Sequence, residues 1–200
     1  MKMDGLPFSQ ACENNKAPIL DVLTRVFAGS TEVLEIASGT AQHATWFAQH
    51  LTHLRWQPTD MSAQMATLEP RCGAYRGANL ASPLCLDVSA RPWPVATVPQ
   101  ALFTANSLHI MPWESVCELF AELGERASAG TLLAVYGPFN YGGEYSSASN
   151  ARFDEWLASQ ASYSAIRDFE RVNELAETAG FKLQEDNAMP ANNRLLVWRK

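Results

Sequence analysis

The sequence has no long apolar run, no basic cluster and no apolar leader segment. Nowhere do about 18 consecutive apolar residues occur, and the opening MKMDGLPFSQ lacks a signal-peptide core. We therefore expect no membrane association and a cytoplasmic location. The 15 Lys and Arg residues are scattered along a chain of formal net charge −6. This disfavours nucleic acid as a partner, because phosphate contacts dominate that kind of affinity.

Cysteine and histidine are few, and they are not arranged as disulfide or metal motifs. The four cysteines are far apart and form no C-x-x-C pair, which favours reduced thiols in the cytoplasm. His43, His50 and His53 lie on or near one expected helix, but they lack a third ligand at a familiar metal spacing. We predict no metal site.

The composition that remains is that of a globular protein. The chain has 200 residues, of which 47% are hydrophobic and 18% charged, so we expect one domain over residues 1–200. Apolar side chains at helical spacing predict a helix from Ser9 to Ala28, within an N-terminal helical segment of residues 1–29. The strand-like run EVLEIA follows, and a second amphipathic helix ends near Leu51.

Strand-like and helix-like segments then alternate. Strands are expected at LRWQPT, PLCLDV, QALFTAN and AGTLLAVYG, with helices at MSAQMATLEPR and from Trp113 to Leu123. This rhythm is typical of parallel βαβ crossovers, so it predicts a doubly wound α/β fold with helices on both faces of the sheet. A last helix, from Phe169 to Ala179, stops at Gly180.

Two closely spaced strands, FKLQEDNAM and RLLVWRK, end the chain. They are about five residues apart, and a parallel crossover needs roughly ten or more. We therefore predict an antiparallel pair. The segment GPFNYGGEYSSASN at 137–150 follows a predicted strand and is rich in Gly, Ser and aromatic residues. We predict a substrate lid there, with a solvated mobile loop as the alternative.

The turn in VLEIASGTAQHATWFAQHL lies at the carboxyl end of a predicted strand, where ligands of open α/β sheets bind. Gly39 permits a positive φ or a close ligand approach, and the next helix offers free N–H donors. Ala37 and Gln42 occupy positions that a G-x-G-x-x-G fingerprint would fill with glycine, and no G-K-[ST] is present. Glu35, one turn away, suits a hydroxyl-bearing or cationic ligand better than a pyrophosphate. A ligand-free βα turn is the alternative.

The segment E-x-A-S-G-T-A resembles the first motif of class I S-adenosylmethionine-dependent methyltransferases, with Ala37 and Ala41 where glycine is commoner. The resemblance implies that Glu35 and Gly39 belong to the cofactor site. It also implies that Asp60, after the second strand, binds both ribose hydroxyls.

Further positions carry the same resemblance. Asp87 matches the residue that contacts the adenine amino group, Val88 supplies a backbone donor, and Met61 packs on the adenine face. Asn106 matches the position that lines the methionine end. An N-cap or surface role is the alternative for the two aspartates.

Nearly the whole chain is similar to the family called domain of unknown function 938, the UPF0585 group. The similarity rests on ACENNKAPIL, LEIASGTAQHA, WQPTD, NSLHIMPW, YGPFNYGGEY, RDFERVNELAETAGF and MPANNRLLVW. It implies a Rossmann-like, seven-stranded, mostly parallel methyltransferase sheet with an antiparallel last strand. Asn15 and Lys16 belong to its amino-terminal signature and are expected to fold over the cofactor, or else to lie on an unliganded helix face.

The acceptor side is expected beyond the fourth and fifth strands. His109 and Glu144 are the candidates for acid–base work, with a structural histidine as the alternative for His109. Asn192 and Asn193, in MPANN, either join the acceptor site or only form a hairpin turn. Substrate-binding candidates are Tyr136, Asn140, Tyr141 and Tyr145.

The sequence therefore predicts a methyltransferase that uses S-adenosylmethionine, releases S-adenosylhomocysteine and acts on a small molecule. Two alternatives stay open: an aminopropyl transferase, or a noncatalytic cofactor-binding module on the same fold. Neither the methyl acceptor nor the oligomeric state has a sequence signature here.

Overall fold

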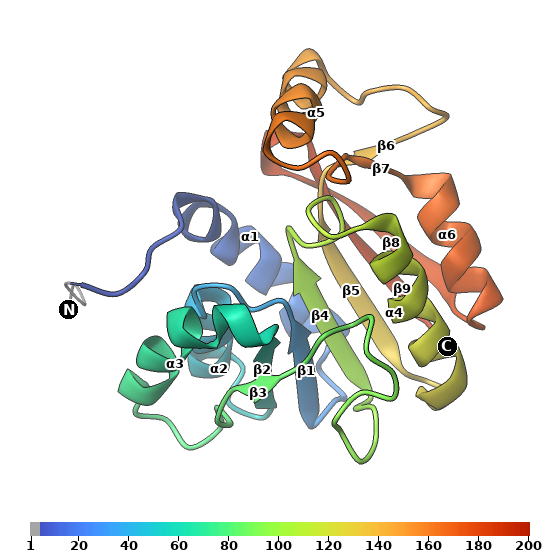
Figure 1. Cartoon of the computed structure of the whole chain (residues 1–200). Helices are drawn as coiled ribbons and strands as arrows, with labels where there is room; N and C mark the ends of the chain where they lie inside the picture. Colours follow the sequence, from blue (N-terminus) through green and yellow to red (C-terminus); the bar gives the residue numbers. More distant parts are fainter. Residues whose placement is uncertain (1–4) are drawn as a thin grey trace.

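Seven strands form one sheet in the order β3-β2-β1-β4-β5-β9-β8 (Figure 1). The computed structural model describes residues 5–200, so expectations for residues 1–4 lie outside the described part. β9 pairs antiparallel with both β5 and β8, whereas the pairs among β1 to β5 are parallel. The mostly parallel sheet with an antiparallel last strand is confirmed. The strands are β1 (Glu32–Ile36), β2 (Arg55–Asp60), β3 (Leu84–Cys85), β4 (Ala101–Ala105), β5 (Leu132–Gly137), β8 (Lys182–Met189) and β9 (Asn193–Arg199).

Helices cover both faces of this sheet. On the first face Phe47, Trp56 and Phe103 pack with ring centroids 5.3 to 6.0 Å apart, and on the second Phe120 meets Trp198 at 6.5 Å. The first face is covered by α1 (Gln10–Val26), α2 (Gln42–His50) and α3 (Met65–Ala74), with a 3-10 turn (Ser62–Gln64) before α3; the second is covered by α4 (Trp113–Arg126) and α6 (Phe169–Thr178). Within residues 5–200, no helix has the length and apolar content needed to cross a membrane.

The structure differs from the sequence-based expectation after β5. β6 (Phe139–Asn140) pairs in parallel with β7 (Arg167–Asp168), and α5 (Ala148–Gln160) begins inside the stretch expected to be irregular. The helix has no apolar stripe to reveal it, because its only buried residues are Asn150 and Leu157. These elements stand beyond the carboxyl ends of β4 and β5 (Figure 1). The exposed irregular part shrinks to about residues 142–146.

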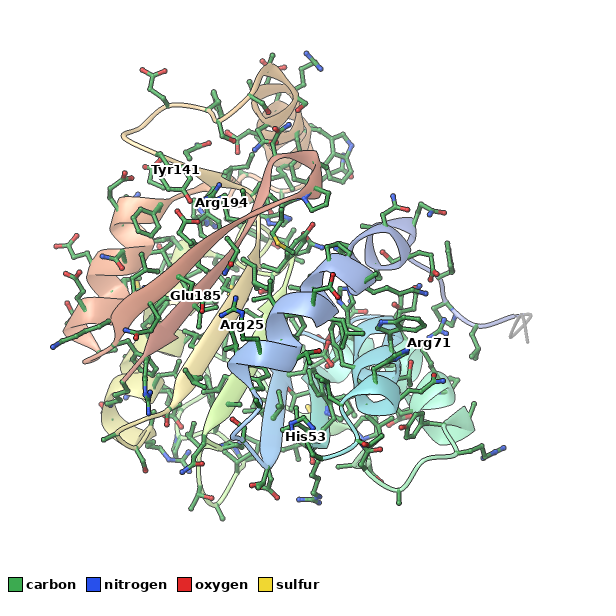
Figure 2. All side chains as sticks on the ribbon, turned by 180° about the vertical axis from the view of Figure 1, so that it is seen from behind. Arg25, His53, Arg71, Tyr141, Glu185 and Arg194 are labelled. Carbon is green, nitrogen blue, oxygen red and sulfur yellow. The ribbon has the colours of Figure 1, made fainter. Side chains whose placement is uncertain are left out.

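Two ion-paired contacts fix the outer parts of the fold. Arg25 of α1 binds both carboxylate oxygens of Glu185 on β8, which joins the first helix to the edge strand (Figure 2). The loop after β3 is held on α4 by Glu122, whose side chain is 1% exposed. Glu122 Oε1 accepts from the Trp93 amide at 2.8 Å and from Arg126 Nη1 at 2.6 Å, and Oε2 accepts from Arg91 Nε at 3.3 Å.

Removing the Glu122 carboxylate is therefore expected to destabilise the fold strongly. Glu122→Ala leaves the buried Trp93 amide without its acceptor and removes one charge-assisted bond from each of Arg91 and Arg126. We expect this to cost about 3 kcal/mol in the free energy of unfolding. Glu125→Ala is the control, because Glu125 also pairs with Arg91 from α4 but is 69% exposed. It should cost less than about 1 kcal/mol. Equal losses in urea denaturation would show that burial of Glu122 does not matter.

Candidate functional site

The turn between β1 and α2 is built from three left-handed residues. Ala37, Gly39 and Ala41 have φ angles of 58°, 56° and 56°. A residue with a Cβ atom pays roughly 1–2 kcal/mol for this conformation, whereas glycine does not. The two alanines thus adopt the left-handed conformation that glycine favours. The turn has the backbone conformation expected if all three positions were glycine.

The end of β2 holds this turn in place. The Gly39 amide donates to Asp60 Oδ2 at 2.7 Å, and the Met61 amide donates to Asp60 Oδ1 at 2.8 Å. Ser38 adds two more bonds to Thr59, because its amide donates to the Thr59 carbonyl at 2.9 Å and its hydroxyl accepts from the Thr59 amide at 3.1 Å. Asp60 and the turn therefore form one hydrogen-bonded unit at the carboxyl edge of the sheet.

Glu35 lies inside the protein and does not reach an open surface. It is 2% exposed, and its Oε2 accepts from the Trp56 indole N–H at 2.7 Å. Burial raises the pKa of Glu35 to about 8, with a smaller contribution from the charge of Asp60. The side chain is therefore largely protonated at neutral pH. Its backbone carbonyl also accepts from the Thr59 hydroxyl at 2.8 Å, which ties the end of β1 to β2.

Other expected cofactor residues follow Asp60 along the same edge. Met61 is 53% exposed, an apolar side chain in water next to the carboxylate. The Asp60 carbonyl accepts from the Leu86 amide at 2.8 Å, which brings Asp87 to this edge. Asp87 is half-buried and uses Oδ1 to accept from the amide and hydroxyl of Ser89, so Oδ2 has no partner among the described residues.

Val88 and Asn106 complete this group of expected residues. Val88 is buried, and its carbonyl accepts from the Trp93 indole at 3.3 Å. Asn106 directly follows β4 in a left-handed conformation with φ 55°, and its amide donates to the Tyr136 carbonyl at 2.8 Å. Because β1 lies between β2 and β4 in the sheet, Asp60 and Asn106 flank the turn from opposite sides.

The two α1 candidates point in different directions. Asn15 is 5% exposed, its Oδ1 lies 2.6 Å from His43 Nε2, and its side chain is next to the Tyr136 hydroxyl. Lys16 instead pairs with Glu13 and stands over the Trp46 ring, with Nζ 4.1 Å from the ring centroid. Asn15 therefore faces the strand ends, whereas Lys16 lies on the outer surface of α1 and α2.

A pocket of about 420 Å³ lies beside these strand ends, between the exposed turn after β6 and the β8–β9 hairpin. The Tyr141 hydroxyl donates to Asp186 Oδ2 at 2.9 Å, and Arg194 Nε donates to Asp186 Oδ1 at 2.6 Å. Figure 2 shows Tyr141 and Arg194 close together at the end of the hairpin. Burial, and then Asp186, hold the pKa of Tyr141 well above its usual range. Polar or charged residues in the lining are Tyr141, Ser146, Asp186, Asn192, Asn193 and Arg194.

The remaining substrate candidates divide into inner and outer residues. The Tyr136 hydroxyl lies next to Asn193 as well as Asn15, so it links the pocket wall to α1. Asn140 is 8% exposed, and its Oδ1 has no hydrogen-bond partner within residues 5–200. Tyr145 is 47% exposed and donates to Asp154 of α5 at 2.8 Å, outside the pocket lining.

The two acid–base candidates lie outside this lining as well. His109 is 5% exposed, and its ring meets Phe153 of α5 edge-on at 5.5 Å. Burial, followed by the positive charge of Arg167, lowers the pKa of His109 to about 4. Glu144 is exposed, and its backbone pairs with Tyr141 to close the turn. His109 packs against the end of β5, because a Cβ atom on Gly137 would lie 3.6 Å from His109 Nδ1.

Asp186 and Arg194 were not identified as site residues from the sequence. No motif marks them, but opposite charges eight residues apart on a predicted hairpin are a usable signal. The hairpin register sets Asp186 opposite Leu196 and Ala188 opposite Arg194, so the two charged residues are neighbours on adjacent strands.

Comparison with known proteins identifies the family and the fold. The family model described as "Protein of unknown function (DUF938)" matches residues 6–200. An O-methyltransferase family protein from Burkholderia thailandensis superimposes with a TM-score of 0.78 at 14% identity, over 92% of this chain and 56% of that one. An O-methyltransferase family 2 protein from Planctomyces limnophilus, solved with apigenin, gives a TM-score of 0.78 at 16% identity, over 95% and 58%.

A third structure, PigF with SAH, has a TM-score of 0.77 at 14% identity, over 94% of this chain and 56% of that one. This chain therefore spans little more than half the length of these solved structures. Their likeness confirms the Rossmann-like methyltransferase fold expected from the sequence.

The protonation of Glu35 predicts a specific pH dependence of stability. Its pKa is about 8 in the folded protein and about 4.3 in an unfolded chain. Because the folded value is the higher one, its contribution to stability is lost as pH rises through this window, by up to about 1.4 kcal/mol per unit of pKa difference. We expect Glu35→Gln to gain stability relative to wild type between about pH 5 and about pH 8 in urea denaturation. A difference independent of pH would contradict a buried, neutral Glu35.

The left-handed alanines predict an unusual response to glycine. Ala37→Gly should raise the free energy of unfolding by about 0.5–1 kcal/mol, because relief of backbone strain exceeds the extra entropy of the unfolded chain. Ala158→Gly, at an exposed position within α5, is the control and should lower it by about 1 kcal/mol. Destabilisation by both substitutions would show that Ala37 is not strained.

Proposed function

The chain belongs to the DUF938 family of proteins of unknown function, and we propose that it is a cytoplasmic, S-adenosylmethionine-dependent methyltransferase that acts on a small molecule. One observation carries the proposal: the left-handed turn at Ala37, Gly39 and Ala41 is bonded through the Gly39 amide to the carboxylate of Asp60. The turn and the carboxylate meet at the carboxyl edge of the sheet. There the carboxylate can accept from the ribose hydroxyls, and the turn can approach the amino-acid part of the cofactor closely.

The residues present fit the cofactor. A Cβ atom at Gly39 would find no other atom within 4 Å, so the space beside the turn is open. Each Asp60 oxygen accepts one amide bond and retains capacity for a hydroxyl of a vicinal diol. The exposed Met61 side chain offers an apolar surface for the adenine ring, and the unpartnered Asp87 Oδ2 suits its amino group. Asn106 flanks the turn on the side assigned to the methionine end.

The protein contributes to the reaction by aligning the acceptor atom with the methyl group of the cofactor. When bound, the cofactor supplies a sulfonium that activates its own methyl group, so the chain needs to orient the acceptor and exclude water. Tyr136 and Asn15 are buried behind Asn193, which lines the 420 Å³ pocket. We propose that Tyr141 and Asn193 contact the acceptor, and that Tyr136 and Asn15 hold Asn193 in the orientation that the acceptor requires.

Removal of a proton from the acceptor is a lesser requirement. An imidazole with a pKa of about 4 is a weak base at neutral pH, which argues against His109 as a general base. Glu144 lies on the exposed turn next to Tyr141 and reaches the acceptor only if this turn closes on the pocket. An acceptor that is already a thiolate or a neutral amine needs neither residue.

Aminopropyl transfer is less well supported by the pocket. A polyamine acceptor requires several carboxylates, and the described lining offers one, Asp186, whose charge Arg194 already neutralises. Isothermal titration calorimetry with S-adenosylmethionine and S-adenosylhomocysteine tests the central proposal. Binding of either molecule supports it, and a folded protein that binds neither shows that it is wrong.

Asp60 is expected to carry much of the affinity. Asp60→Ala removes the acceptor for both ribose hydroxyls and should weaken S-adenosylhomocysteine binding by about 1–3 kcal/mol, roughly 5- to 150-fold in Kd. Asp21→Ala, on the exposed surface of α1, is the matched control and should bind as wild type does. Circular dichroism checks that both variants fold. An unchanged Kd for Asp60→Ala would remove this residue from the site.

A further inference from the structure

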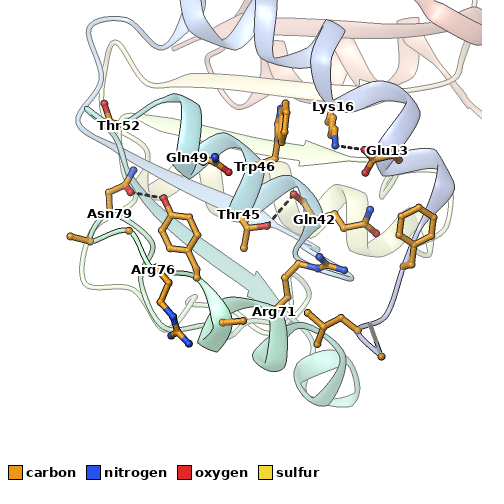
Figure 3. Close-up of a pocket in the computed structure, with 17 residues that line it drawn as sticks. Glu13, Lys16, Gln42, Thr45, Trp46, Gln49, Thr52, Arg71, Arg76 and Asn79 are labelled. Atoms are coloured by element: carbon orange, nitrogen blue, oxygen red, sulfur yellow. Dashed lines mark hydrogen bonds and ion pairs between the residues drawn. The ribbon is translucent and has the colours of Figure 1, made fainter. Parts of the chain in front are cut away.

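A larger groove lies on the outside of the molecule, away from the strand ends. It has a volume of about 1290 Å³ and is formed by the segment from Gly5 to Phe8, the outer face of α2, and the end of α3 with the turn after it (Figure 3). Its α2 wall consists of residues spaced at i, i+3, i+4 and i+7, so one continuous helix face lines it. These residues are Gln42, Thr45, Trp46 and Gln49.

The groove is separate from the proposed cofactor site. Gly39, Asp60 and Asp87 are not in its lining. Arg71 stands between the two regions: its Nε donates to the Thr40 carbonyl at 2.8 Å and its Nη2 to the Pro7 carbonyl at 2.6 Å. A molecule in the groove therefore contacts the outer side of this arginine and leaves the strand ends free.

The groove is positively charged in an otherwise acidic chain. Its described lining includes three cationic side chains and one carboxylate, whereas the whole chain has a net charge of −6. The carboxylate, Glu13, is already paired with Lys16. The local excess of two positive charges matches the charge of a phosphate monoester at neutral pH, which is about −1.5 to −2. The cations are Lys16, Arg71 and Arg76.

An unused hydrogen-bond donor points the same way. Arg76 is exposed, and its one hydrogen bond in the described structure is a 3.3 Å contact with the Gly73 carbonyl. Its guanidinium group therefore has donors that an acceptor-rich anion would satisfy. The Trp46 indole N–H on the opposite wall is buried and has no acceptor within residues 5–200, so it serves as a reporter of changes in the wall.

Two aromatic side chains flank these donors. Trp46 lies on the α2 wall, and Tyr75 lies on the α3 wall with its hydroxyl donating to Asn79 at 3.0 Å (Figure 3). The Lys16 ammonium already occupies a position over the Trp46 ring. We propose that this groove is a second small-molecule site that binds a flat ring carrying a phosphate group. The ring packs against Tyr75, and the phosphate binds the neighbouring Arg76. Trp46 forms the opposite wall, where its ring is already covered by Lys16 and by His50, whose ring centroid is 4.0 Å away.

Phenyl phosphate is the probe, with phenol and inorganic phosphate as its two halves. Titration is followed by calorimetry and by the indole N–H resonance of Trp46, assigned as the signal lost in Trp46→Phe. We expect phenyl phosphate to shift this resonance and each half to bind about tenfold more weakly. Arg76→Gln should weaken phenyl phosphate about tenfold, because a charge-assisted bond is lost. Arg152→Gln, an exposed arginine on α5, is the control and should bind as wild type does.

The titration is repeated with excess S-adenosylhomocysteine, which separates this proposal from the proposed function. Binding of phenyl phosphate that S-adenosylhomocysteine leaves unchanged supports a separate site, and competition between the two overturns it. Absence of phenyl phosphate binding, or equal binding by Arg76→Gln and wild type, also overturns it. Equal affinity for inorganic phosphate and for phenyl phosphate would show that the aromatic ring does not contribute to binding, and it would overturn the proposal of a ring-binding site. A protein that fails to bind S-adenosylhomocysteine contradicts the proposed function alone and leaves the result for the groove intact.

Discussion

The bond between the Gly39 amide and the Asp60 carboxylate holds the functional edge of this protein together. Two alanines in left-handed conformations give the turn an intrinsic tendency to relax, at a cost of roughly 1–2 kcal/mol each. The carboxylate opposes this by fixing the middle residue, and the paired bonds between Ser38 and Thr59 fix the turn one residue earlier. Strand β2 therefore shapes the turn after β1, so the Asp60 carboxylate and the turn cannot move independently.

The layer beneath this edge is polar but largely uncharged at neutral pH. Glu35 has a pKa of about 8, and His43 has a pKa lowered to about 4, by burial first and then by the charge of Lys16. Both groups are neutral between these values. Asn15 and Tyr136 continue the layer towards the β8–β9 hairpin. A layer of buried, neutral hydrogen-bonding groups avoids the cost of unpaired buried charge, and the low local dielectric strengthens each bond within it.

The sequence was sufficient for what depends on periodicity, and insufficient for what depends on contacts between distant residues. The alternation of strands and helices predicted the sheet, and the short connection before Asn193 predicted its antiparallel end. Helix α5 was missed because it covers the strand ends with only Leu157 and Asn150 buried, which leaves no apolar stripe. The burial of Glu35 was missed because a carboxylate at a strand end has no local signal that distinguishes an open edge from the Trp56 indole. The left-handed conformation of Ala37 has no local sequence signal, because it depends on bonds that Ser38 and Gly39 make to β2, 21 residues away.

The turn is also held from its outer side, and this links the start of the described chain to the site. Arg71 of α3 binds the carbonyls of Thr40 and Pro7, while the Gln42 side chain pairs with both the amide and the carbonyl of Ser9. Ser9 in turn caps α1 by accepting from the Cys12 amide. A displacement of the turn would therefore be transmitted to the cap of α1. Since α1 carries Asn15 to the strand ends, the contact of Asn15 with Tyr136 depends on the same turn that Asp60 holds.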